Sequence, residues 1–236
     1  MKKVFLLLAI ALLFVFNSCK DDNKDEPLPD NHEYVDLGLP SGTLWATCNI
    51  GADSPEEFGD YFAWGETTPK GNYQWNNYKW HSSDNNNWLD ELAKYWAGED
   101  YGTPDGKCEL DPEDDAATVN WGPGWRMPTL GQLQELVSEC EWQWVKQNGV
   151  YGRLLTGPNG KTLFLPAAGG YSTSPFNEGI CCYYWSRTLC SPDQLVLEAA
   201  GSHEAYILFA NSWRKLVWYD GRYDGLTVRA VCARKK

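Results

Sequence analysis

The aromatic residues of this chain are the ones whose number and spacing most suggest a function. That function is the binding of a ligand. The 236 residues include 13 tryptophans and 13 tyrosines. Planar rings with polar tips suit sugar rings and protein surfaces alike. The densest group lies among asparagines and serines and consists of Tyr73, Trp75, Tyr78, Trp80 and Trp88. We expect Trp75, Tyr78, Trp80 and Trp88 to form a ligand platform, with packing in the core as the alternative for the whole group.

Catalytic and metal-binding patterns are weak by comparison. The three histidines are scattered without a second ligand at zinc-like spacing: His32, His81 and His203. Four carboxylates gather around an expected helix start: Asp111, Glu113, Asp114 and Asp115. Capping and the helix dipole explain carboxylates at such a place. Nucleophile-elbow, P-loop and dinucleotide motifs are absent from the sequence. We therefore expect a protein that is not an enzyme and needs no cofactor or metal.

The net charge of −12 narrows the choice of partner. Proteins that bind the phosphate backbone concentrate lysine and arginine to displace counterions. Nucleic acid is therefore not an expected partner. The remaining candidates are a glycan, or an envelope or fimbrial protein.

The N-terminus has the layout of a secretory signal, with Lys2 and Lys3 before an apolar run over residues 4–16. As a helix this run would rise about 20 Å, too short for a hydrocarbon core of roughly 30 Å. Its end, residues 16–19, is similar to a bacterial lipobox, in which a small residue precedes a cysteine. We predict a signal peptide over residues 1–18 and lipid attachment at Cys19, which would anchor the protein in a membrane. Ordinary secretory cleavage is the alternative.

A charged and polar segment follows, with Pro27 and Pro29 and without apolar periodicity. This composition predicts a flexible acidic tether over residues 19–32. The segment resembles the acidic tag of surface-exported lipoproteins of Bacteroidota, which favours the outer face of an outer membrane. A solvated spacer explains it equally well. Residues 33–236 are expected to form one domain, because a later linker is lacking.

The first half of that domain shows local signals for a hairpin and three short helices. Residues 33–39 and 44–50 flank the turn-rich quartet 40–43, which predicts two paired strands. Capping patterns predict helices that start near Ser54, near Asp111 and at Thr129. The helix after Thr129 carries the apolar stripe that ends at Cys140.

The second half is expected to be strand-rich. A hairpin is predicted over residues 153–165, around the turn 157–160. Further strands are predicted at 183–189, 205–210, 215–219 and 226–232. Helices amid mostly antiparallel strands indicate an α+β fold.

Several strings match one family in order. They are Tyr34–Gly42, Trp45–Asn49, Tyr61–Glu66, Trp121–Thr129, Phe164–Gly169, Tyr184–Ser186 and Thr227–Val231. Together they resemble the Fibrobacter succinogenes major paralogous domain family across nearly the whole mature chain. That resemblance implies a C-type-lectin-like fold, related to formylglycine-generating enzymes. The relation to formylglycine-generating enzymes implies an alternative function, that of an oxidoreductase or another envelope enzyme. The calcium-binding motifs of C-type lectins and the copper-site motif of those enzymes are missing here.

The eight cysteines allow disulfides in an exported protein. Resemblance to related sequences implies a bridge between Cys48 and Cys140, with Cys232 as a competing partner. Cys181 and Cys182 would point to opposite sides of a strand, so only one of them should reach Cys190. We select Cys182 with Cys190. The expectation as a whole is a surface lipoprotein that acts as a binding or adhesion module.

Overall fold

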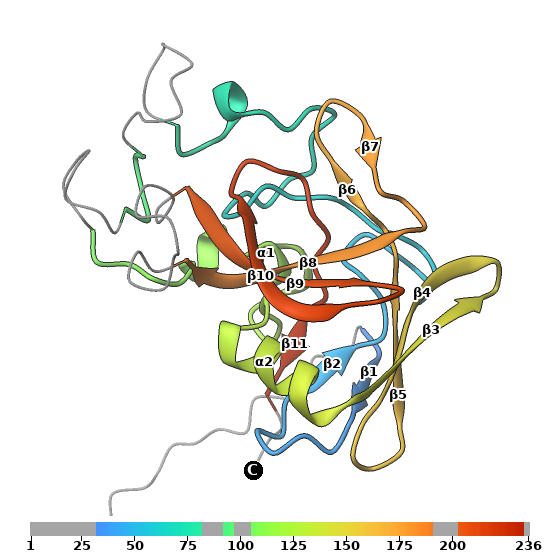
Figure 1. Ribbon diagram of the computed structural model, residues 1–236. Coiled ribbons are helices and arrows are strands. Elements are labelled where there is room, and N and C mark those ends of the chain that lie inside the picture. Colours follow the sequence, from blue (N-terminus) through green and yellow to red (C-terminus); the bar gives the residue numbers. More distant parts are fainter. Residues whose placement is uncertain (1–31, 82–91, 97–104, 191–202, 234–236) are drawn as a thin grey trace, which may run out of the picture.

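Small antiparallel sheets and a few short helices build the fold of the computed structural model (Figure 1). The structure describes residues 32–81, 92–96, 105–190 and 203–233. Helices and antiparallel strands occur together in one chain, which confirms the α+β class.

The first sheet joins the two ends of the domain. Its strands are β1 (Tyr34–Asp36), β2 (Leu44–Ala46) and β11 (Val231–Cys232), in the order β1-β2-β11. The predicted N-terminal hairpin is therefore confirmed, although its strands are shorter than the apolar pattern suggested. The predicted strand at 226–232 is reduced to its last residues, because Leu226 and Thr227 make isolated bridges to Phe62 and Tyr184 instead.

The helices test the capping predictions one by one. Helix α2 (Leu130–Glu139) begins at Thr129, whose side chain and that of Gln132 form the predicted capping box. A 3-10 turn η2 (Pro112–Asp114) follows Asp111, and α1 (Ala116–Trp121) has Asp115 as its N-cap. The helix expected near Ser54 is not formed, because the chain there makes single turns.

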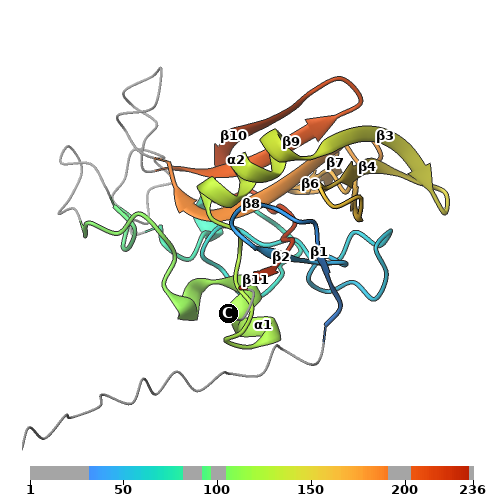
Figure 2. The ribbon, with the colours of Figure 1, turned by 90° about the horizontal axis from the view of Figure 1, so that it is seen from below.

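Three further sheets complete the described fold. One contains β3 (Glu141–Gln147), β4 (Val150–Thr156) and β5 (Thr162–Pro166), and a small one pairs β6 (Gly170–Tyr171) with β7 (Pro175–Phe176). The hairpin predicted over 153–165 is confirmed as β4 and β5, whereas β3 was not predicted. The remaining sheet has the order β10-β9-β8, from β8 (Cys181–Leu189), β9 (Glu204–Asn211) and β10 (Lys215–Gly221). Figure 2 shows α2 lying along this sheet.

Fully buried indoles occupy the centre of the fold. Trp64, Trp125 and Trp185 are almost inaccessible to solvent. The Nε1 atoms of Trp64 and Trp185 donate to the carbonyls of Ser186 and Phe62, at 2.9 and 2.8 Å. Burial of indole rings with their N–H groups satisfied stabilises the packing of loop segments that have little regular structure.

Two buried arginines tie loops to this core. The Nε of Arg222 donates to the hydroxyl of Tyr78 at 2.9 Å, and its Nη1 donates to the carbonyl of Tyr95 at 3.0 Å. The Nη1 of Arg229 donates to the carbonyls of Ala46 and Thr47 at 3.1 and 2.7 Å. Each guanidinium thus supplies several donors to backbone segments that would otherwise lack partners.

Candidate functional site

The predicted aromatic platform is placed mainly inside the protein. Trp75 lies in the 3-10 turn η1 (Trp75–Asn77) and is 9% exposed, and Tyr78 is 3% exposed. Both belong to a core cluster with Tyr73. The Tyr78 hydroxyl donates to the carbonyl of Trp64 at 2.7 Å. Trp75 and Tyr78 therefore pack the core in the way given as the alternative, and they do not offer an open ring face.

Trp80 is the half-buried member of the predicted platform. The ammonium group of Lys79 lies 4.3 Å from its ring centroid, and that of Lys94 lies 5.4 Å away. Tyr95 meets the indole at 5.7 Å with an interplanar angle of 87°. These neighbours cover the ring faces that a sugar would need. Trp88 lies outside the described residues.

The acidic residues near η2 form an ion-pair network. Oxygen atoms of Asp111, Glu113 and Asp114 lie within 4.8 Å of one another, a spacing that can suit a metal ion. The ammonium of Lys94 lies 2.6, 3.7 and 2.6 Å from the three carboxylates. It occupies the place that a cation would take. Hydrogen bonds from Lys107 and Lys94 lower the pKa of Asp111 to about 2.

Asp115 has a structural role that agrees with the capping interpretation. Its Oδ1 accepts hydrogen bonds from the backbone N–H groups of Ala117 and Thr118, both at 3.0 Å. The same carboxylate accepts the N–H of Met127 at 3.0 to 3.1 Å, which joins α1 to the segment before α2. Burial raises the pKa of Asp115 despite these donors.

The cysteines are free thiols throughout the described residues. Neither the bridge expected between Cys48 and Cys140 nor the one expected between Cys182 and Cys190 is formed. Cys140 is the C-cap of α2 and packs in a core cluster, whereas Cys48 is partly exposed beside Thr47. Apolar periodicity predicts that Cys48, Cys140 and Cys232 all point inward; this is confirmed for Cys140 and Cys232, whereas Cys48 is only partly buried. Burial raises the pKa values of Cys140 and Cys182 to about 11 and about 12, which keeps both protonated at neutral pH.

Among the described residues, a groove on the β10-β9-β8 sheet has the features of a binding site. Its volume is about 410 Å³, within the usual size range of ligand pockets. It is lined by aromatic, aliphatic and charged side chains: Tyr183, Ile207, Phe209, Arg214, Leu216, Trp218, Tyr219 and Asp220. A cavity of about 280 Å³ is smaller and is lined by the stacked rings of His32 and Trp121, and one of about 350 Å³ beside Lys70 has no aromatic lining.

Strand register brings the groove residues together. Tyr183 pairs with Phe209 across β8 and β9, and Phe209 pairs with Leu216 across β9 and β10. Ile207 pairs with Trp218 one step further along the same face. Directly opposed residues of paired strands project from the same side of a sheet. Three strands therefore contribute rings and apolar side chains to one surface.

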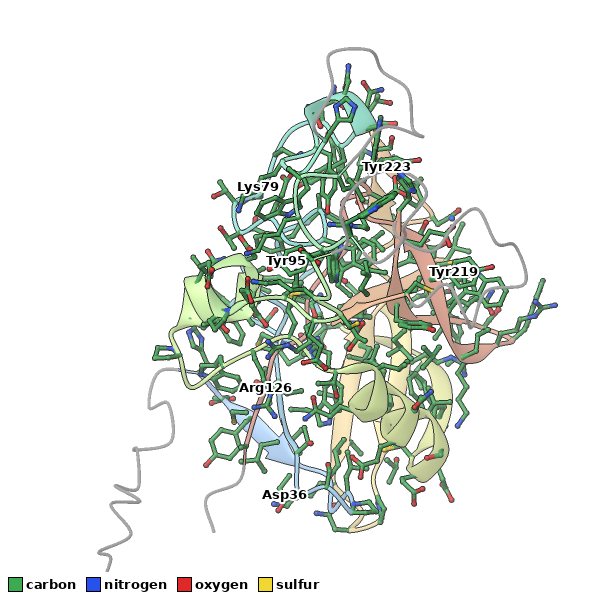
Figure 3. The ribbon with its side chains drawn as sticks, turned by 90° about the vertical axis from the view of Figure 1, so that its left-hand side faces the viewer. Asp36, Lys79, Tyr95, Arg126, Tyr219 and Tyr223 are labelled. Carbon is green, nitrogen blue, oxygen red and sulfur yellow. The ribbon has the colours of Figure 1, made fainter. Side chains whose placement is uncertain are left out.

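The aromatic rings are arranged in contact with one another. The rings of Trp218 and Tyr219 are stacked, with centroids 4.8 Å apart and an interplanar angle of 13°. Those of Tyr183 and Phe209 lie 5.4 Å apart. Trp218 remains 50% exposed, so part of a large ring faces solvent. Figure 3 shows Tyr219 on the opposite side of the view from Lys79 and Tyr95, away from the predicted platform.

Opposite charges stand at the two ends of the groove. Arg214 and Asp220 are six residues apart along an extended strand, or about 20 Å at roughly 3.3 Å per residue. Arg214 follows the hairpin turn, where its N–H donates to Oδ1 of Asn211 at 2.9 Å. Asp220 accepts the N–H of Gly221 at 2.9 Å. A ligand along the groove would meet a guanidinium at one end and a carboxyl group at the other.

Carboxyl groups cluster at the Asp220 end. Burial raises the pKa of Asp220, and Asp224 donates a hydrogen bond to it. Burial and the charge of Asp220 raise the pKa of Asp224 to about 7. The pKa of Glu204 is also raised to about 7, first by burial and then by Asp220. Within the described chain none of these three carboxyl groups forms a salt bridge.

Sequence reasoning located the strands of this groove but not the groove itself. The segment 215–219 was expected to be a strand, yet its Trp218 and Tyr219 were not singled out. The sequence signal that could have located the groove was the aromatic content of two neighbouring predicted strands, 205–210 and 215–219.

Comparison of the chain with protein-family models, curated proteins and solved structures finds no match. Among the described residues, we find no helix with the length and apolar character to cross a membrane.

Proposed function

We propose that this protein is a lipid-anchored surface protein of a Bacteroidota-type outer membrane that binds glycans without catalysing a reaction. The groove on the β10-β9-β8 sheet carries the proposal. It combines a half-exposed indole with stacked aromatic neighbours and polar groups at both ends. Aromatic faces pack against the C–H faces of sugar rings, and carboxylate and guanidinium groups hydrogen-bond their hydroxyls.

The domain is proposed to have a C-type-lectin-like fold of the Fibrobacter succinogenes major paralogous type. Two features support this. The string that runs from Trp121 to Thr129 links α1 to α2, in the arrangement that the resemblance implies. Asp115 fastens that string by accepting the N–H of Met127. The first and last strands of the domain also pair with a common partner, β2.

A retention assay on a glycan array tests the proposed function. The probe is the full chain, purified in detergent. Trp218→Ala should weaken retention by about 30-fold or more, because truncation of a central aromatic residue at a binding site costs about 2 kcal/mol or more. Tyr151→Ala is the matched control, since Tyr151 is 45% exposed on β4 and does not line the groove.

Both variants should keep the melting temperature of the parent chain, because both side chains are substantially exposed. Equal retention of the two variants would contradict a glycan site at Trp218. So would a parent chain that is retained by no sugar on the array.

A protein ligand is the second candidate, and the edge position of β10 favours it. β10 stands at the end of the described sheet, and Trp213 in the adjoining turn is 88% exposed. An exposed strand edge can add an extended segment of an envelope or fimbrial protein. Capture of such a protein from an envelope extract by the parent chain, and not by Trp213→Ala, would support this candidate.

The anchor is proposed to be the lipid on Cys19, which lies outside the described residues. Incorporation of a labelled fatty-acid analogue tests it in cells. Cys19→Ala should abolish the label and leave unprocessed or soluble chain. Unchanged incorporation in that variant would show that the lipid is attached elsewhere.

A further inference from the structure

Among the described residues, the carboxyl groups at the Asp220 end of the groove have no salt-bridge partner. Asp220 lines the groove, and its carboxyl group interacts with those of Asp224 and Glu204. In the described chain, the side chains whose pKa values the charge of Asp220 raises are acids or phenols. They are Tyr183 of β8, Glu204 of β9, and Tyr223 and Asp224 after β10.

The cation that lines the groove is too distant to compensate this charge. Arg214 immediately precedes β10 and is six residues from Asp220, about 20 Å in an extended chain. Exposed charges separated by more than a Debye length, about 8 Å at physiological ionic strength, are largely screened from each other. The Asp220 end thus remains locally negative while a large aromatic surface lies directly beside it.

We propose that the groove selects glycans that carry a free ammonium group, with the amine of an amino sugar at Asp220 and its ring against Trp218. This inference rests on the proposed glycan-binding function. It adds the ligand's charge and its orientation along the groove. An ammonium group donates up to three hydrogen bonds and supplies the positive charge that the carboxyl groups lack.

A bare metal ion fits the same place less well. In the described residues the ligand atoms that converge to within 4.8 Å are those of Asp111, Glu113 and Asp114, not those of Asp220, Asp224 and Glu204. An ammonium on a sugar needs only one or two close carboxylate oxygens, because the ring gains further contact area from the aromatic wall. The carboxyl group of Asp220 and the aromatic surface beside it therefore both favour an amino sugar.

Proton linkage gives this site a second signature. Burial and mutual repulsion favour the protonated forms of Asp224 and Glu204, as their raised pKa values show. A bound cation favours the ionised forms. At about pH 5.5, where the amine of the sugar is itself protonated, binding of an amino sugar should therefore release protons, whereas binding of an uncharged sugar should not.

The experiment is calorimetry on the full chain in detergent with two tetrasaccharides. One is β-1,4-linked glucosamine, and the other is its fully N-acetylated counterpart, which has the same backbone without the charge. The glucosamine tetramer should bind at least tenfold more tightly, or about 1.4 kcal/mol. Repeating the titration at about pH 5.5, where the amines of the tetramer are already protonated, in buffers of different ionisation enthalpy should show proton release for the glucosamine tetramer alone.

Asp220→Asn should remove the preference and the proton release, while it keeps the acceptor for the N–H of Gly221. Asp224→Asn is a second variant that tests the same charge from the neighbouring position. Glu141→Gln, an exposed acid on β3, is the control and should behave as the parent chain does.

The outcomes separate the two proposals. Equal affinity for both tetramers, or a preference that survives in both aspartate variants, overturns the amino-sugar inference and leaves glycan binding intact. Binding of neither tetramer, together with no retention on the glycan array, overturns both. Binding of an oligolysine peptide in place of both sugars also overturns both and indicates a basic protein ligand.

Discussion

Replacing Glu204 with glutamine should make the protein more stable at alkaline pH. Oε2 of Glu204 is buried and has no hydrogen-bond partner within the described chain. Burial, followed by the charge of Asp220, raises the pKa of Glu204 from 4.5 to about 7. Ionisation of this carboxyl group therefore destabilises the folded protein. Glu204→Gln removes the charge and keeps the shape of the side chain.

The sign of the effect follows from proton binding. Because the folded-state pKa is raised above the unfolded value, the folded protein holds the proton more tightly. The parent chain is thus most stable below about pH 4.5 and loses this contribution as the pH rises through about 7. The variant does not titrate at this position, so its stability relative to the parent chain should increase over that pH range.

The size of the effect can be bounded from the same values. The interval from 4.5 to about 7 corresponds to roughly 3 kcal/mol at 1.36 kcal/mol per pH unit. Glu204 is only partly buried, and solvent screening reduces this to about 1 to 2 kcal/mol. For a domain of about 200 residues, that gain at pH 8.5 raises the melting temperature by roughly 2 to 8 °C.

Thermal unfolding followed by circular dichroism at pH 5 and pH 8.5 measures the difference. Glu141→Gln serves as the control, because Glu141 is exposed on β3. The reasoning is refuted if Glu204→Gln has the same melting temperature as the parent chain at pH 8.5. It is also refuted if the variant is stabilised equally at both pH values, since that result would reflect packing and not charge.

Three further changes test other parts of the structure. Trp75→Ala should lower the free energy of unfolding by about 3 to 5 kcal/mol in denaturant titrations, because it empties a buried aromatic position; a loss under 1 kcal/mol would show an exposed ring. Asp115→Ala should cost about 1 to 3 kcal/mol in the same assay, since it leaves buried N–H groups without an acceptor, and an unchanged midpoint would contradict this. The parent chain should lose stability as the pH falls from about 4 to about 2, because the folded-state pKa of Asp111 is depressed. Asp111→Asn should make the stability less dependent on pH in this range. An unchanged pH dependence in this variant would argue against the ion pairs of Asp111 with Lys94 and Lys107.

Local signals explain the predictions that the structure confirms. The capping box of Thr129 and Gln132 involves side chains and backbone of one turn, so the start of α2 is readable without any tertiary contact. The hairpin of β4 and β5 is similarly defined by its turn residues. The helix expected near Ser54 shows the limit of such signals, because a cap without an apolar stripe to bury does not sustain a helix.

Composition predicted an aromatic binding surface, but only the tertiary structure shows which aromatics are exposed. Trp75 and Trp218 have the same side chain, yet the first is buried and the second is half exposed. Their exposure depends on what packs over them, which for Trp75 includes the rings of His81, His203 and Tyr223. The contacts with His203 and Tyr223 join residues more than a hundred positions apart, so no local pattern contains them.

The sequence by itself determined the charge balance, the α+β class and the positions of several strands, because each depends on composition or on neighbours within one turn or one hairpin. The tertiary structure decided where the groove lies and which charges stand at its ends. Strand alternation assigns residues to two faces, but the register of β8, β9 and β10 is what aligns Tyr183, Phe209 and Trp218 on one of them. The raised pKa values of Asp224 and Glu204 also depend on burial in the folded protein, and Glu204 lies beside Asp220 only after β9 and β10 have paired.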